Sequence, residues 1–269
     1  MADRSIFRVW RAFLARPNDD RVKTLGIAFL VALGCGLTVS IAAVTLRPVQ
    51  QANIEGQRQA RMTSMLAALP GIGDILADAG ADAVETRVVD LDTGRIDDEI
   101  DPATFDQNAA AADPNASTDL SRREDLAGIG RRENHALVHF VRREGELALV
   151  VLPVRGSGYQ STIRAYLALE ADLDTVAALA VYEQGETPGL GARIADAPWQ
   201  AQWSGKRVFD ETGEPVIEVV GSGASGPHQV DGISGATVTG FAVSDMIQFW
   251  TGPRGYGPFL NALRDGDIE

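Results

Sequence analysis

Cysteine and basic side chains are both scarce in this chain of 269 residues. Cys35 is the single cysteine, so an internal disulfide is excluded and cysteine usage says nothing about the redox compartment. Residues 1–47 hold seven basic and three acidic residues, whereas the remainder holds 17 basic and 34 acidic residues. A body this acidic repels phosphate backbones, and no basic stripe with interleaved aromatic residues is present. We therefore expect no nucleic-acid binding.

Charged residues are also missing from the 23-residue segment 24–46. A helix of this length measures about 34 Å, which is sufficient to cross a hydrocarbon core of ~30 Å. A cleaved signal peptide is the alternative, but its apolar region would be shorter, and no clean cleavage site follows. We expect an uncleaved, single-pass membrane anchor. Because the segment has no ionisable residue, we expect no ion path through it.

The charges on either side of this segment predict its orientation. Six basic residues precede it, and only Arg47 follows it immediately. The positive-inside rule then places residues 1–23 in the cytoplasm and residues 47–269 on the far side, which in a bacterium is the periplasm beyond the inner membrane. The predicted domains are thus a basic cytoplasmic N-terminus, a transmembrane helix and a periplasmic domain.

Hydrophobic periodicity predicts an α+β fold for the periplasmic part. A helix continues from the anchor over 48–69, and a polar surface excursion covers 101–134. Apolar and β-branched runs predict strands over 84–91, 136–141, 146–154, 163–170, 175–182 and 216–220, and a helix over 238–250. Strands outnumber helices and are joined by short turns. We therefore expect a mainly antiparallel sheet with flanking helices rather than βαβ units.

Two glycine-rich pieces follow the last predicted strand. Residues 221–226 spell G-x-G-x-x-G, the written form of a dinucleotide fingerprint. Such a fingerprint must open a helix on which the pyrophosphate docks, but Asp231 and Gly232 would stop a helix within a turn, and no βαβ unit surrounds it. We therefore predict that 221–226 is a surface loop.

The second piece, residues 231–237, stands directly before a predicted amphipathic helix. Apolar residues recur at helical spacing within it: Phe241, Val243, Met246, Ile247 and Trp250. The backbone N–H groups of Gly235, Ala236 and Thr237 would point outward from the helix start, which makes an anion site. Alternatively, Ser234 or Thr237 merely caps the helix, and the residues by themselves leave both interpretations open.

Asp231-x-x-Ser234-Gly235-Ala236-Thr237 matches the flavinylation signature D-x-x-[S/T]-G-A-T without a mismatch. In proteins with this signature, the last threonine is esterified to the phosphate of FMN. The blocks 153–170, 182–191 and 257–266 extend the likeness, so that nearly the whole chain resembles the C subunits of the sodium-translocating NADH:quinone reductases. One departure is Gln160, where the family commonly has tryptophan, and this puts one expected ring contact in doubt.

The resemblance implies a covalent FMN, joined to Thr237 by a phosphoester. Around the ester it implies Asp231, Ser234, Gly235 and Ala236. Around the flavin ring it implies the loop Glu186, Thr187, Gly189, Leu190 and Gly191, together with Tyr159, Ser161 and Thr162. Thr187 would supply a donor and Leu190 an apolar lid. By its residues alone the 186–191 loop is equally a Pro-Gly turn between strands.

The resemblance further implies an electron-carrier subunit of a sodium-translocating NADH:ubiquinone reductase, with no catalytic residue and no complete active site in this chain. Its partners would be the other subunits, the membrane, and a flavin transferase that uses FAD and magnesium. One alternative is the flavinylated G subunit of an Rnf-type electron-transfer complex, although the 101–134 excursion and the Gly-Pro-Phe-Leu ending favour the first. Another is a flavin-free periplasmic binding module.

Other patterns are weaker. His135 and His139 stand four apart in a predicted strand, with no third ligand nearby, so we interpret them as a surface pair and expect no metal site. No G-x-S-x-G elbow supports a hydrolase. Asp231 is expected to shape its loop rather than to act as a catalytic base.

Overall fold

The structure, a computed structural model, describes residues 83–268 without a gap, residues 23–37, and residues 10, 14, 15, 17, 20, 21, 40, 76, 77, 79 and 80. The chain divides into two compact units, Met1–Arg58 and Gln59–Glu269. In the first, residues 23–37 are helical and their large apolar side chains are exposed. Among the described residues, no helix combines the length and apolar character needed to cross a membrane. The end of the predicted span 24–46 and all of the predicted helix 48–69 lie outside the described residues.

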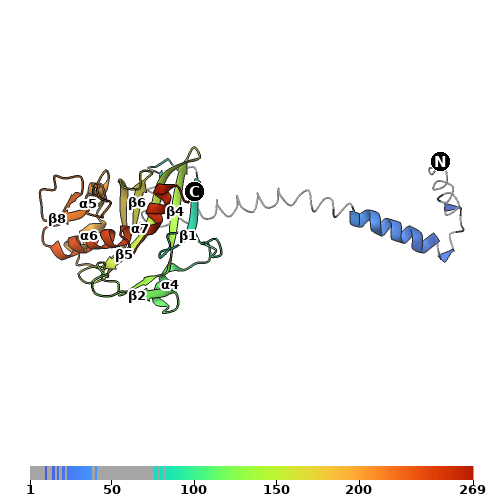
Figure 1. The fold of residues 1–269 in the computed structure, drawn as a ribbon, viewed down its shortest axis with the longest axis horizontal. Coiled ribbons are helices and arrows are strands. Elements are labelled where there is room, and N and C mark those ends of the chain that lie inside the picture. The colour runs from blue at the N-terminus through green and yellow to red at the C-terminus, as the bar shows by residue number, and fades with distance from the viewer. Residues whose placement is uncertain are drawn as a thin grey trace. The chain divides into compact units, whose positions relative to one another are not determined.

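The second unit is built on a five-stranded antiparallel sheet, visible in Figure 1. Its order is β1-β4-β5-β6-β7, with β1 Ala83–Asp90, β4 His135–Arg143, β5 Glu146–Ser157, β6 Thr162–Glu170 and β7 Val176–Glu183. All neighbouring strands are antiparallel, and β4 to β7 follow one another as hairpins. The predicted mainly antiparallel α+β fold is therefore confirmed.

Alternation of side chains gives the sheet two different faces. On one face, Leu152 and Leu167 belong to the main core, which also contains the buried side of α6 (Thr237–Thr251) and α7 (Gly257–Asp265). On the other face, Tyr166 belongs to a smaller apolar cluster. Figure 1 shows α6 and α7 across the sheet. The sheet thus separates the helix that begins at Thr237 from everything on its second face.

The polar excursion 101–134 has more structure than the sequence predicts. It contains α4 (Gln107–Ala112), β2 (Ser117–Asp119) and β3 (Arg131–Glu133), of which β2 and β3 pair. Two of its charged residues are buried: Arg132 is 2% exposed and Glu133 is fully buried. A charge withdrawn from water needs a partner. Arg132 pairs with Asp92 and Glu133 with Arg155, so the excursion is fixed to the domain.

Short elements connect β7 to α6. They are η1 (Gly191–Ala195), α5 (Ala197–Gln200), η2 (Ala201–Trp203), β8 (Glu218–Val220) and β9 (Gln229–Asp231). The predicted strand 216–220 survives only as β8, which pairs in parallel with β9. Residues 221–226 form the loop between them, with no helix after it, as predicted.

Helix α6 confirms the predicted helix over 238–250 but corrects one of its faces. Val243, Met246, Ile247 and Trp250 are fully buried, as their spacing predicts. Phe241, predicted on the same face, is 49% exposed. Spacing alone misplaces it because α6 is apolar on both sides at its start. Helix α7, which we did not predict, has proline in its first turn and ends at Gly266 in the left-handed conformation.

Candidate functional site

Thr237 is the first residue of α6, and its side chain is exposed. The residue at the N-cap position is Ala236, and no side chain caps the helix. Within the part of the chain that the structure describes, neither Ser234 nor Thr237 makes a hydrogen bond through its hydroxyl. The capping alternative is therefore wrong. The first N–H groups of α6 carry a partial positive charge and point away from the helix, so this end suits an anion.

Two glycines allow the chain to turn sharply into this helix. Gly232 donates its N–H to the carbonyl of Val220 at 2.7 Å, and a Cβ on Gly232 would lie 2.7 Å from the same oxygen. Gly235 has φ +80°, which side chains rarely adopt. The N–H of Ala236 then closes the turn on the carbonyl of Ile233 at 2.9 Å. The motif is therefore a compact loop that leaves the hydroxyl of Thr237 free.

Asp231 lies at the start of this motif and holds the neighbouring loop. Its Oδ1 accepts the N–H of Ala224 at 2.8 Å, and its carbonyl accepts the indole N–H of Trp199 at 2.9 Å. Both contacts join Asp231 to neighbouring segments of the same domain. They support the interpretation that Asp231 shapes the loop.

The carboxylate of Glu186 joins three segments of this site. The side chain is buried, and it accepts hydrogen bonds from five groups: the N–H groups of Tyr159 (3.2 Å), Gln160 (2.9 Å) and Ser161 (3.1 Å), and the hydroxyls of Ser161 (3.1 Å) and Thr239 (2.7 Å). Burial raises the pKa of Glu186, but these hydrogen bonds outweigh it, and the net pKa is lowered. At neutral pH a carboxylate therefore connects residues 158–161, residues 186–191 and the first turn of α6.

Glycines make room for this carboxylate. A Cβ on Gly158 would lie 2.6 Å from Oε1 of Glu186. One on Gly191 would lie 2.7 Å from the hydroxyl oxygen of Thr239 and 2.9 Å from Cβ of Glu186. At both positions a side chain would force these neighbouring side chains to shift. The backbone at Gly191 therefore lies directly against Glu186.

The loop 186–191 reaches the start of α6 through Leu190. Its Cδ2 lies 3.0 Å from where a Cβ on Gly235 would stand, and its side chain is 43% exposed. Leu190 is therefore an exposed apolar side chain beside the start of α6. Tyr159, on the second loop, is 65% exposed, and Gln160 is also exposed.

The remaining predicted residues are less central. Thr187 closes its own turn by accepting the N–H groups of Leu190 and Ala192 at its carbonyl, both at 3.1 Å. Thr162 is exposed at the first position of β6, and Glu186 receives no hydrogen bond from it. Two further residues at the start of α6 were not predicted: Thr239, which is 3% exposed, and the exposed Val238. Helical spacing could have found Thr239, since it lies on the buried side of α6 with Val243.

The two histidines do not form a surface pair. His139 is 5% exposed, and its Nδ1 lies 2.9 Å from the hydroxyl of Thr86, so the prediction is wrong for this residue. Burial lowers the pKa of His139 to about 4. His135 instead lies 3.2 Å from Asp97. Within the described ranges, no group of three potential ligands could hold a metal ion.

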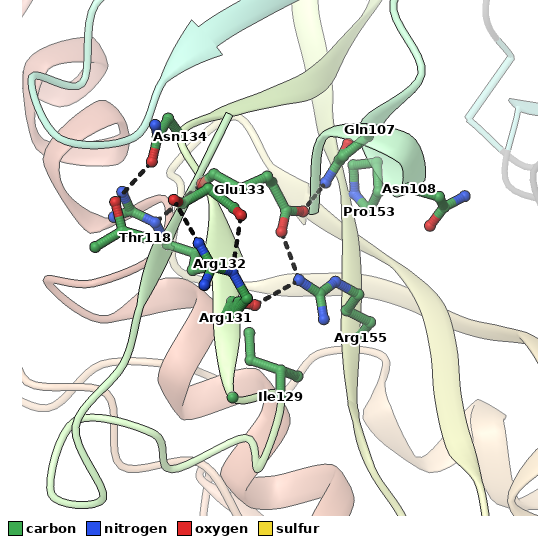
Figure 2. Close-up of polar contacts among 12 residues, drawn as sticks. Gln107, Asn108, Thr118, Ile129, Arg131, Arg132, Glu133, Asn134, Pro153 and Arg155 are labelled. Atoms are coloured by element: carbon green, nitrogen blue, oxygen red, sulfur yellow. Dashed lines mark hydrogen bonds and ion pairs between the residues drawn. The ribbon is translucent and has the colours of Figure 1, made fainter. Parts of the chain in front are cut away.

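A cavity of about 440 Å³ lies apart from this site, on the second face of the sheet. It contains none of the predicted site residues. Figure 2 shows its polar wall, in which Glu133 accepts hydrogen bonds from Gln107 (2.7 Å) and Arg155 (2.6 Å). Tyr166 stacks on Tyr182 at its other side, with ring centroids 4.6 Å apart. Within this wall, the carboxylate of Glu133 and the guanidinium of Arg155 form an ion pair.

Comparisons with known proteins indicate the family of the chain. The family model of the FMN-binding domain matches residues 158–252, which include the loops 158–161 and 186–191 and all of α6. The C subunit of the Na(+)-translocating NADH-quinone reductase of Vibrio alginolyticus is 40% identical over 258 residues, covering 95% of this chain and 100% of that protein. The C subunit of the Pseudomonas aeruginosa reductase is 38% identical over 258 residues, covering 93% and 98%.

Solved structures give the same result. The crystal structure of Shewanella oneidensis NqrC has a TM-score of 0.65 and 35% sequence identity, covering 80% of this chain and 99% of that one. The C subunit from Parabacteroides distasonis, at 24% identity and a TM-score of 0.53, supports the fold alone.

Proposed function

The chain belongs to the family of the C subunits of the Na(+)-translocating NADH-quinone reductases, and from this membership we propose that it is the FMN-carrying, electron-transferring subunit of such a complex. We further propose that FMN is held on Thr237 by a phosphoester. The observation that carries this proposal is the exposed, unbonded hydroxyl of Thr237 at the uncapped start of α6. The relatives match nearly the whole chain, which favours a C subunit over an Rnf-type G subunit or a flavin-free module.

The chain's own residues fit the phosphate end of FMN. A phosphodiester keeps one negative charge, and the start of α6 would stabilise it by about 0.3–1 kcal/mol, because N–H groups there lack partners. Ser234 and Gly235 are exposed and small, so a phosphate can approach the backbone. Leu190 would cover one side of the flavin, with Thr187 and Tyr159 nearby. When bound, FMN supplies the electron-accepting chemistry, while the surrounding protein tunes its potential.

Esterification needs a second protein, because a threonine hydroxyl is unreactive by itself. We propose a flavin transferase that uses FAD and magnesium. The hydroxyl oxygen of Thr237 would form the new bond to the phosphorus of the FMN half of FAD. The pyrophosphate bond would break, AMP would leave, and the proton of the hydroxyl would pass to solvent. The exposure of Thr237 suits such an encounter.

We also propose that residues 24–46 anchor the chain in the bacterial inner membrane, with residues 1–23 in the cytoplasm and 47–269 in the periplasm. The exposed apolar side chains of the helical residues 23–37 support this, Leu25 (71%) and Phe29 (66%) most strongly. A helix with exposed apolar side chains all round suits lipid. The chain would then bring its flavin to the other subunits on the periplasmic side.

A denaturing gel under ultraviolet light tests the ester. Full-length protein from its native host should give a yellow fluorescent band that survives denaturation, because the bond is covalent. Thr237→Ala should abolish the fluorescence, whereas Ser222→Ala, which removes another exposed hydroxyl outside the motif, should retain it. A dark wild-type band, from cells that contain the transferase, would contradict the proposal. Intact mass then identifies the added group.

A further inference from the structure

The outer face of α6 is apolar where a surface helix should be polar. Val238, Phe241 and Asp245 share this face, because residues three and four apart lie side by side on a helix. Val238 is 58% exposed and Phe241 49%. The opposite face of the same turns is fully buried in the core. Since a helix that is apolar on both sides is normally covered on both sides, this face lacks its cover.

This apolar face belongs to a larger exposed surface around Thr237. Five large hydrophobic side chains are exposed within residues 83–268, and four of them lie on the three segments that Glu186 joins: Tyr159, Leu190, Val238 and Phe241. Exposed apolar side chains that gather in one place mark an interaction site, whereas scattered ones do not.

Asp245 gives the outer face a charge. It lies one turn beyond Phe241 and is half-buried, yet it has no hydrogen-bond or ion-pair partner among the described residues. Burial raises the pKa of Asp245, since nothing nearby offsets the loss of water. A carboxylate in this position is stabilised if the covering surface brings a cation.

We propose that the outer face of α6, defined by Val238, Phe241 and Asp245, docks another subunit of the reductase complex through an apolar surface that carries a lysine or arginine opposite Asp245. The inference rests on the proposed function and adds a partner surface to it. Thr237 immediately precedes Val238, so a subunit seated here lies beside the esterified position. Contact and electron transfer then use the same end of one helix.

Other occupants fit this face less well. A second copy of the chain would meet it across a two-fold axis and bring one Asp245 towards the other, which is repulsive. A lipid surface would bury the carboxylate without a partner. The flavin ring could cover apolar side chains, but it has no cation for Asp245.

Phe241→Lys in the full chain, produced in the native host with all other subunits, tests the proposal. Phe241 is half-exposed, so the variant should fold, keep the melting temperature of the wild type and retain its covalent flavin. Its co-purification with an affinity-tagged partner subunit and its NADH-to-quinone turnover should both fall at least tenfold. Ala171→Lys is the matched control, because it adds the same charge on an exposed turn at the opposite end of β6. It should behave as wild type.

Asp245→Lys provides a second variant that does not depend on the apolar contact. Replacing the acid with a cation should also weaken co-purification, and the defect should be relieved by higher salt, because salt screens the new repulsion. Normal assembly and turnover in both variants would overturn the proposal. So would normal assembly with loss of flavin in Phe241→Lys, since the face would then belong to the flavin. If the wild-type chain carries no covalent flavin but assembles, and both variants fail to assemble, the ester is rejected and the docking face is supported.

Discussion

Thr237 and Thr239 stand two residues apart on α6 and have opposite environments. Thr237 is exposed and its hydroxyl is unbonded, whereas Thr239 is 3% exposed and donates to Glu186 at 2.7 Å. A helix turns by about 200° over two residues, so one hydroxyl faces solvent and the other faces the core. The position of the helix start therefore decides which of the two hydroxyls is accessible from solvent.

The residue-scale prediction concerns His139, whose pKa is lowered by burial to about 4 from an ordinary value of 6.5. The folded state favours the neutral form of His139. The contribution of this residue to the free energy of unfolding is therefore fully present above pH 6.5 and is lost as the pH falls from 6.5 through 4. The loss is about 3 kcal/mol, since one pKa unit corresponds to ~1.4 kcal/mol.

Urea unfolding of the wild type at pH values from 7 to 4 should therefore show a falling free energy of unfolding. His139→Gln should flatten the curve between pH 6.5 and 4, because the glutamine side chain does not titrate. Equal slopes for the two proteins would contradict the assignment.

At the scale of elements, the sequence predicted the sheet well and the connections poorly. The runs that became β1 and β4 to β7 are strongly alternating or β-branched, so local pattern and tertiary structure agree. The excursion 101–134 was predicted as plain surface because burial of Glu133 and Arg132 depends on Arg155 and Asp92, which are distant in sequence. The candidate site shows the same division. The motif ending at Thr237 was found by its resemblance to the flavinylation signature, because its residues alone also allowed a helix cap. The role of Glu186 depends on three segments that only the fold brings together.

The element-scale prediction is that Glu186→Gln loosens the join between the loops 158–161 and 186–191 and the start of α6. An amide has one acceptor oxygen instead of two, and its NH₂ would face donors. Each hydrogen bond to a charged group contributes about 1.5–3 kcal/mol. The loss of one such bond should therefore lower the free energy of unfolding by about 1.5–3 kcal/mol. Urea unfolding at pH 7 measures this, and the yield of covalent flavin should fall with it.

Glu183→Gln is the matched control for this change. Glu183 is 62% exposed and pairs with Arg164 at 3.3 Å. An exposed ion pair contributes roughly 0–1 kcal/mol, so this variant should stay close to the wild type. If both variants unfold at the same urea concentration, Glu186 does not hold the site together.

For the whole molecule, the uneven charge and the single cysteine allow a direct test of topology. In a Cys35→Ser background, Ala2→Cys and Ala171→Cys each introduce the only thiol of the chain, the second on an exposed turn of the sheet domain. If residues 24–46 cross the inner membrane with the basic end inside, a membrane-impermeant maleimide should label position 171 in intact spheroplasts. Position 2 should be labelled only after lysis, because six basic residues hold that end in the cytoplasm. Labelling of position 2 in intact spheroplasts would contradict the orientation, and release of either variant from washed membranes would contradict the anchor.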